Sequence, residues 1–278
     1  MAFASRTISS DSSEAAGAAR DRIAERFAQL RESGRRALVP YITAGYPDIE
    51  RTVDLLRGLA DAGADVIEMG LPFSDPMADG PIIQASSQRA LEQGMTFDKL
   101  LDVARRANVR IPLVLFSYLN PLLAAGSNAL ARAADAGFAG VLVTDLPVGA
   151  DAEREAWLGE GPLSFIRLVA PTTPQDRMRE IATHGSGFVY LISRLGVTGV
   201  RDSLPPDLAA TLDRLRAVTS LPICVGFGIS RPEQAKSVAR LADGVVVGSA
   251  IVRASGEERG VESAAALTRT LRAAIDDA

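Results

Sequence analysis

The chain alternates short apolar runs with loops and amphipathic helical stretches, and this alternation can be counted eight times. The apolar runs are nearly continuous Val, Leu and Ile, which is typical of parallel strands whose outer face is covered by helices. Eight such units predict an α/β fold, a (β/α)₈ TIM barrel, although periodicity alone leaves a doubly wound open sheet as the competing architecture. The expected strands are residues 37–43, 65–69, 112–117, 140–144, 163–169, 188–192, 222–225 and 244–247.

The length and composition agree with one such domain. The chain has 278 residues, of which 47% are hydrophobic and 23% are charged, so it can bury a large core. We expect a single barrel domain over residues 19–278, with a short amphipathic helix over 22–31 that closes one end of the barrel. Residues 1–18 are rich in Ser and Ala, and we expect a disordered or loosely attached extension there.

The charge and hydropathy patterns exclude several classes of protein. The formal net charge is −4, and the basic residues are spread along the chain, which argues against a nucleic-acid partner. No run of about 18 apolar residues is present that could cross a membrane. The first residues lack the apolar core of a secretory signal. Their Ser, Ala and Arg content leaves a transit peptide as an alternative, but Asp11 and Glu14 count against it, so we expect a cytoplasmic protein.

The second expected strand ends in an acidic residue, Glu68, and continues into a loop rich in proline and glycine. Strand alternation places Val66 and Glu68 on one face, so the carboxylate shares the side of an apolar residue. In a barrel of this kind the chemistry lies at the C-terminal ends of the strands. Glu68 is therefore a candidate catalytic acid, and Asp79 in the following loop is a second carboxylate. The alternative is a solvated strand-end acid, with Asp75 and Asp79 as ordinary turn and helix-entry residues.

Two late loops contain glycines where a ligand could approach the backbone. Residues 226–230 follow the seventh strand, and residues 248–250 follow the eighth and lead into a helical segment. Glycine permits close approach, and amides at a helix start favour anions, so these loops indicate a phosphate site. Tight turns also need glycine, which is the competing explanation. A nucleotide-binding P-loop motif is absent from the sequence.

The sixth strand carries a candidate side chain, Tyr190, which alternation could direct into the barrel with its hydroxyl near the mouth. An ordinary buried core tyrosine is the alternative interpretation. The loop that follows contains Gly196 and Gly199 around Thr198, and this glycine content is typical of a lid that closes over a site.

Other common catalytic constellations find no support in the sequence. The single histidine, His184, falls in a helix-to-strand turn, on the face opposite the expected site, so we expect neither a zinc cluster nor Ser-His-Asp chemistry. The only lysines, Lys99 and Lys236, fall on helices, away from the strand ends where a Schiff base would form. The single cysteine, Cys224, is expected in the core. Acid–base chemistry must then rest on carboxylates and tyrosine.

Several stretches closely resemble the α subunit of tryptophan synthase. The most specific is Glu68-Met-Gly-Leu-Pro-Phe-Ser-Asp-Pro-Met-Ala-Asp-Gly-Pro81, and the similarity extends from about Phe27 to the C-terminus. The other matching stretches are residues 40–47, 168–174, 193–199 and 225–230. The resemblance implies retro-aldol cleavage of indole-3-glycerol phosphate to indole and glyceraldehyde 3-phosphate.

The resemblance also implies a role for individual residues. Glu68 matches the acid/base that protonates the indole ring carbon, Asp79 the carboxylate that accepts the indole N–H, and Tyr190 the tyrosine beside the acid. We expect the partly apolar setting of Glu68 to raise its pKa, while Asp79 stays ionised. The phosphate would be held by Gly199, Gly228, Gly248 and Ser249, and the lid loop contains Arg194, Gly196 and Thr198.

The family's α subunit binds a β subunit that carries pyridoxal phosphate and receives indole through a tunnel, in an α-β-β-α complex. We therefore expect no cofactor in this chain. The segments 72–79 and 118–121 match the docking surface, with Pro72, Asp75, Pro76 and Asn120 as docking residues. Leu119 stands where a second aromatic residue is common in the family, which alters the shape of this contact.

Two alternatives to this function have testable signatures. Another phosphosugar barrel, an indole-glycerol-phosphate synthase or a ribulose-phosphate epimerase, would be expected to need a strand-end lysine or metal-binding histidines, which the chain lacks. A non-catalytic barrel could bind a phosphorylated ligand and regulate a partner. The presence of Glu68, Asp79 and Tyr190 together argues against that function, and an assay for indole release separates the two.

Overall fold

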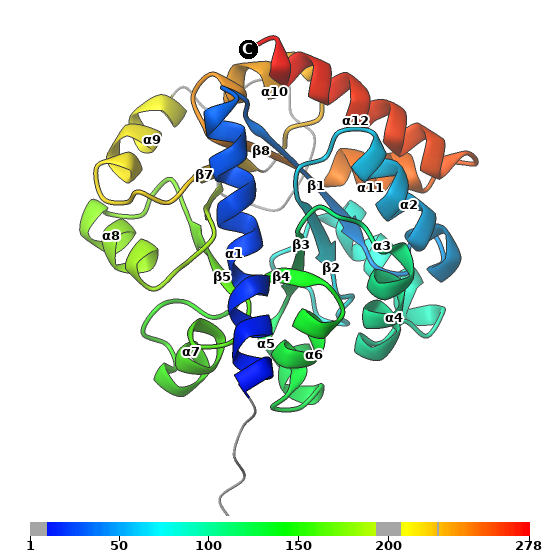
Figure 1. The fold of residues 1–278 in the computed structure, drawn as a ribbon. Coiled ribbons are helices and arrows are strands. Elements are labelled where there is room, and N and C mark those ends of the chain that lie inside the picture. The colour runs from blue at the N-terminus through cyan, green and yellow to red at the C-terminus, as the bar shows by residue number, and fades with distance from the viewer. Residues whose placement is uncertain (1–9, 193–206, 227) are drawn as a thin grey trace, which may run out of the picture.

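The structure, a computed structural model, describes residues 10–192, 207–226 and 228–278, and it is a closed barrel of parallel strands surrounded by helices (Figure 1). The strands pair in sequence order, and β1 pairs with β8 to close the barrel. The strands are β1 (Ala37–Thr43), β2 (Ile67–Gly70), β3 (Leu113–Ser117), β4 (Phe138–Val143), β5 (Ser164–Val169), β6 (Val189–Ile192), β7 (Ile223–Gly226) and β8 (Gly244–Val247). The TIM-barrel prediction is confirmed, and the open sheet is excluded.

The helices alternate with the strands and form the outer layer. They are α1 (Ser10–Glu32), α2 (Ile49–Asp61), α3 (Pro81–Glu92), α4 (Phe97–Ala107), α5 (Leu119–Ala124), α6 (Ala129–Asp135), α7 (Ala152–Gly159), α8 (Gln175–Thr183), α9 (Leu208–Arg216), α10 (Pro232–Ala239), α11 (Ser249–Ser255) and α12 (Gly260–Asp276). Several helices end at a glycine that a strand soon follows. Gly63 and Gly137 have φ angles of 101° and 99°, which side chains with a Cβ rarely adopt.

Strand alternation divides the core into two parts. Val39 and Val66 belong to the cluster inside the barrel. Their neighbours Leu38 and Ile67 belong to the larger cluster between the barrel and the helices. All four are buried without measurable exposure, which explains why the strands are nearly continuous apolar runs. Cys224 lies in the inner cluster, as predicted.

Helix α1 crosses the N-terminal end of the barrel (Figure 1). Its side chains Ile23, Phe27 and Leu30 are buried and pack with the inner cluster, and the ring of Phe27 lies 5.7 Å from that of Phe188. This confirms that a helix closes one end. The helix begins at Ser10, earlier than the predicted residue 22, because the Ala-rich stretch before Arg22 has high helix propensity.

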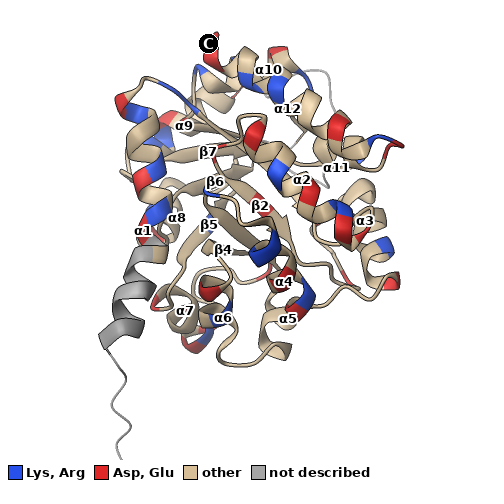
Figure 2. Cartoon of the chain, turned by 45° about the vertical axis from the view of Figure 1, so that its right-hand side comes forward, with Lys and Arg blue, Asp and Glu red and all other residues tan. Residues whose placement is uncertain are grey.

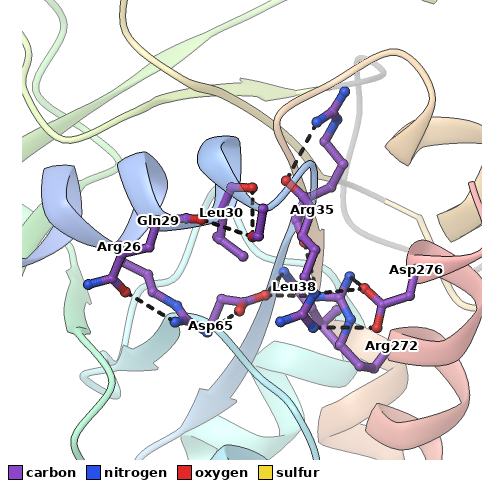
Figure 3. A network of polar contacts seen from close by, with 10 residues as sticks. Arg26, Gln29, Leu30, Arg35, Leu38, Asp65, Arg272 and Asp276 are labelled. Atoms are coloured by element: carbon purple, nitrogen blue, oxygen red, sulfur yellow. Dashed lines mark hydrogen bonds and ion pairs between the residues drawn. The ribbon is translucent and has the colours of Figure 1, made fainter.

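A buried carboxylate, Asp65, joins both terminal helices to the barrel just before β2 (Figure 3). Its oxygens accept hydrogen bonds from Arg26 of α1 at 2.5 Å, from Arg272 of α12 at 2.8 Å and from the Leu38 backbone N–H at 2.7 Å. Arg272 also pairs with Asp276 at 2.6 Å. The network therefore fixes the two ends of the described chain to the same end of the barrel.

Charged residues lie mainly on the outer helices, where the two signs are intermixed (Figure 2). In the part of the chain that the structure describes, the basic residues therefore form no stripe of the kind that nucleic-acid binding requires. Among the described helices, none combines the length and the apolar character needed to cross a bilayer.

Candidate active site

The C-terminal ends of the strands surround a small pocket, with a volume of about 130 Å³, that is partly open to solvent. The three residues predicted to carry the chemistry, Glu68, Asp79 and Tyr190, all line it. The other described residues of the wall are mostly apolar or small: Tyr41, Ala78, Ile83, Phe116, Thr144, Leu168, Ile192, Val246, Gly248 and Ser249. A site with few polar groups in an apolar wall is suited to a ligand with an aromatic part.

Glu68 lies in β2, on the inner face of the barrel, and is 1% exposed. Its backbone is in register with Tyr41 of β1 and Val114 of β3. Burial disfavours the charged form and raises the pKa of Glu68 to about 8, as predicted in direction. Among the described residues, no group hydrogen-bonds its Oε1 atom. A buried carboxyl that is protonated at neutral pH and has an unsatisfied oxygen is suited to proton transfer.

Asp79 lies at the end of the loop between β2 and α3, where Gly80 separates it from the first residue of the helix. The loop is folded by hydrogen bonds from Met77 N–H to the Asp75 carbonyl and from Asp79 N–H to the Pro76 carbonyl. Burial raises the pKa of Asp79 to about 6, and a hydrogen bond from Tyr118 opposes that rise. The ionised form therefore predominates at neutral pH, in contrast to Glu68.

Two tyrosines point toward the mouth of the barrel, each beside a glycine of the next strand. A Cβ on Gly226 would lie 2.1 Å from the hydroxyl of Tyr190, and a Cβ on Gly70 would lie 2.1 Å from that of Tyr41. The glycines therefore provide the space that each phenol occupies. Tyr190 was predicted, whereas Tyr41 was missed as a site residue. The sequence did contain a signal for Tyr41, because strand alternation places it on the same inward face as Val39, in the strand next to that of Glu68.

The residues predicted to hold phosphate are described only in part. Gly248 and Ser249 line the pocket, and Ser249 begins α11, whose first amides lack acceptors within the helix. Gly228 has a φ angle of 84°, a conformation that glycine allows. Gly199 and the predicted lid residues Arg194, Gly196 and Thr198 lie outside the described residues.

The predicted docking residues differ in exposure. Asp75 and Asn120 are exposed, Pro76 is half-buried and Pro72 is buried. Two large apolar side chains are exposed on the same two segments or next to them: Met77 is 84% exposed in the loop, and Leu123 is 37% exposed on α5. Among the described residues, these are the two large apolar side chains that are exposed to solvent.

The residues excluded by sequence lie away from the pocket. His184 follows α8, where its Nδ1 approaches the Glu180 carbonyl at 2.8 Å. Lys99 lies on α4 and Lys236 on α10, as predicted. Within the described ranges, no group of three His, Cys, Asp or Glu side chains could hold a metal ion.

The fold and site together define a class: a TIM barrel whose C-terminal mouth holds two carboxyl groups with different protonation states. The family model of the tryptophan synthase alpha chain matches residues 27–276. The alpha chain of Nitratidesulfovibrio vulgaris is 48% identical over 235 residues, covering 84% of this chain and 91% of that protein.

Solved structures agree with this match. The tryptophan synthase subunit alpha of Legionella pneumophila has a TM-score of 0.84 at 36% identity and covers 92% of this chain and 99% of its own. A Mycobacterium tuberculosis tryptophan synthase structure has a TM-score of 0.83 at 35% identity and covers 91% and 98%. The chain therefore belongs to the tryptophan synthase alpha chain family. It is a lyase of tryptophan biosynthesis that cleaves indole-3-glycerol phosphate to indole and glyceraldehyde 3-phosphate.

Proposed function

We propose that Glu68 and Asp79 divide the work of this cleavage between them. The observation that carries the proposal is the difference between the two groups: the pKa of Glu68 is raised to about 8 by complete burial, whereas that of Asp79 is about 6. At neutral pH one carboxyl can therefore donate a proton while the other carries a negative charge.

The chemistry needs both states. Glu68 donates its proton to the indole ring carbon that bears the glycerol chain, and positive charge then develops on the ring nitrogen. Asp79 accepts the ring N–H and stabilises that charge. The carbon–carbon bond breaks next: its electron pair returns to the ring, the adjacent hydroxyl loses its proton, and an aldehyde forms. Glu68, now a carboxylate, accepts the hydroxyl proton and is ready for the next cycle.

Tyr190 and the glycine loops position the substrate for this reaction. Tyr190 is 5% exposed, and its phenol lies in the wall that the aromatic ring would face. Gly228, Gly248 and Ser249 would bind the phosphate, together with Gly199. Arg194, Gly196 and Thr198 would belong to a loop that covers the site. The chain itself uses no cofactor in this mechanism.

We also propose a cytoplasmic protein with a β subunit as partner, in an α-β-β-α complex in which the β subunit carries pyridoxal phosphate. The docking surface comprises Asp75, Met77, Asn120 and Leu123, whose exposed apolar atoms would be covered by the partner. Pro76 would contact the partner at the edge, and Pro72 would hold the loop in shape from within. The domain proposed for this function is 19–278. Residues 1–18 are proposed as an extension, of which residues 10–18 form the first part of α1.

The test is indole production from indole-3-glycerol phosphate by the purified chain, with and without a β subunit, for the parent and for Glu68→Gln. General acid–base catalysis usually contributes about 10²- to 10⁴-fold, so Glu68→Gln should lower kcat by at least about 10²-fold. A variant that retains activity would exclude Glu68 as the proton donor. If the parent binds the phosphate ligand and releases no indole under either condition, the alternative of a non-catalytic regulatory barrel holds.

A further inference from the structure

Tyr118 connects the end of β3 to the loop that carries Asp79. It precedes α5 as its N-terminal cap residue and is 4% exposed. Its hydroxyl donates to Asp79 Oδ2 at 3.2 Å and accepts from the Ala78 backbone N–H at 2.9 Å. Its ring also packs against Phe73 at the start of the same loop, with 5.2 Å between centroids. One side chain therefore contacts the loop at both ends.

We infer that Tyr118 is a positioning residue that acts through Asp79, with a hydroxyl that fixes the direction of the carboxylate and stabilises its ionised form. The sequence had placed this residue only in the docking segment 118–121. Its hydrogen bond to Asp79, which lines the pocket, assigns it a second role. The inference rests on the role proposed for Asp79 and adds a residue to it.

The surroundings of Asp79 explain why a neutral donor matters there. Three other titratable groups line the same pocket as Asp79, namely Tyr41 of β1, Glu68 of β2 and Tyr190 of β6, and Tyr118 after β3 contacts Asp79 directly. Among the described residues that line the pocket, none is Lys or Arg. Burial raises the pKa of Asp79, and the Tyr118 hydrogen bond is the interaction that lowers it.

Removal of the hydroxyl should therefore raise the pKa of Asp79 further. Tyr118→Phe keeps the ring and its contact with Phe73, so the loop remains packed. Because Asp79 must be ionised, the acidic limb of the kcat/KM profile should move to higher pH. We expect a loss of roughly tenfold at pH 6, from a hydrogen bond to a charged acceptor, and a smaller loss at pH 7.5.

The experiment measures kcat and KM for indole production from pH 5 to pH 9 in the parent, Tyr118→Phe, Asp79→Asn and a control, Tyr46→Phe. Tyr46 is half-buried and its hydroxyl lies beside Gly256, outside the pocket, so its profile should match the parent. We expect Tyr118→Phe to lower kcat with a shifted acidic limb and little change in KM.

The outcomes distinguish a failure of the inference about Tyr118 from a failure of the role proposed for Asp79. If Asp79→Asn is inactive, two results for Tyr118→Phe overturn the inference: a kcat/KM profile lowered equally at every pH, or a profile that matches that of the parent. An active Asp79→Asn instead overturns the proposed role of Asp79 itself. A shift of the acidic limb in Tyr118→Phe, absent in Tyr46→Phe, supports the assignment.

Discussion

Replacing Asp65 with Asn should strongly destabilise the barrel without changing its chemistry. Asp65 is 1% exposed and accepts hydrogen bonds from two guanidinium groups and one backbone amide at the N-terminal end of the barrel. Asparagine keeps the shape of the side chain. It removes the negative charge and turns a donor toward the arginines, so the charges of Arg26 and Arg272 lose their shared partner (Figure 3).

The structure sets the size of the effect. Breaking a buried ion pair by removing one partner typically costs about 3–5 kcal/mol. Arg272 retains Asp276 at 2.6 Å, and the Arg26 side chain is 29% exposed, so the lower end of that range, about 3 kcal/mol, applies. A loss of this size in a domain of 150–250 residues or more lowers Tm by roughly 6–12 °C, at about 2–4 °C for each kcal/mol.

Thermal unfolding followed by circular dichroism measures this change, with Asp135→Asn as the matched control. Asp135 is an exposed aspartate of α6, and its replacement should change stability by less than about 0.5 kcal/mol. Indole production at 25 °C should remain at the parental rate because the pocket lies at the opposite end of the barrel. A Tm for Asp65→Asn within 2 °C of the control would refute the role given to this network.

Two further predictions concern activity and assembly. The pH profile of kcat/KM for the parent should be bell-shaped, because activity rises as Asp79 ionises near pH 6 and falls as Glu68 loses its proton near pH 8. Roughly a tenth of the maximum kcat/KM should remain at pH 5 and at pH 9. A profile that is flat across this range contradicts the assignment. The Met77 side chain is 84% exposed, so Met77→Asp should leave the activity of the isolated chain unchanged. The same variant should weaken binding of the β subunit at least about tenfold, measured by titrating activity with that subunit. Unchanged affinity would exclude Met77 from the docking surface.

The arrangement of the strands could be predicted from the sequence because burial on both faces produces an unmistakable pattern. Residues 37–43 and 244–247 were expected as strands with the bounds that β1 and β8 have. The start of β2 was less accurate: Asp65 was expected within the strand and lies before it. The Asp65 carboxylate accepts hydrogen bonds from Arg26 and Arg272, which are distant from it in sequence. A local sequence pattern contains no information about such partners.

The site was predictable where strand alternation determines the direction of a side chain. Glu68 and Tyr190 were found in this way, because each shares the face of an apolar neighbour near a strand end. The position of Asp79 came from resemblance, since alternation does not apply in a loop. The hydrogen bond between Tyr118 and Asp79 joins two loops that follow different strands, so only the folded barrel reveals it.

The central claim is that Glu68 is protonated at neutral pH because it is buried in the mouth of the barrel. The most direct measurement is a ¹³C NMR titration of the Glu68 side-chain carboxyl, assigned by its absence in Glu68→Gln. The account predicts a pKa of about 8. A carboxyl that titrates at the ordinary value near 4.3 would contradict it, because Glu68 would then carry no proton to donate at neutral pH.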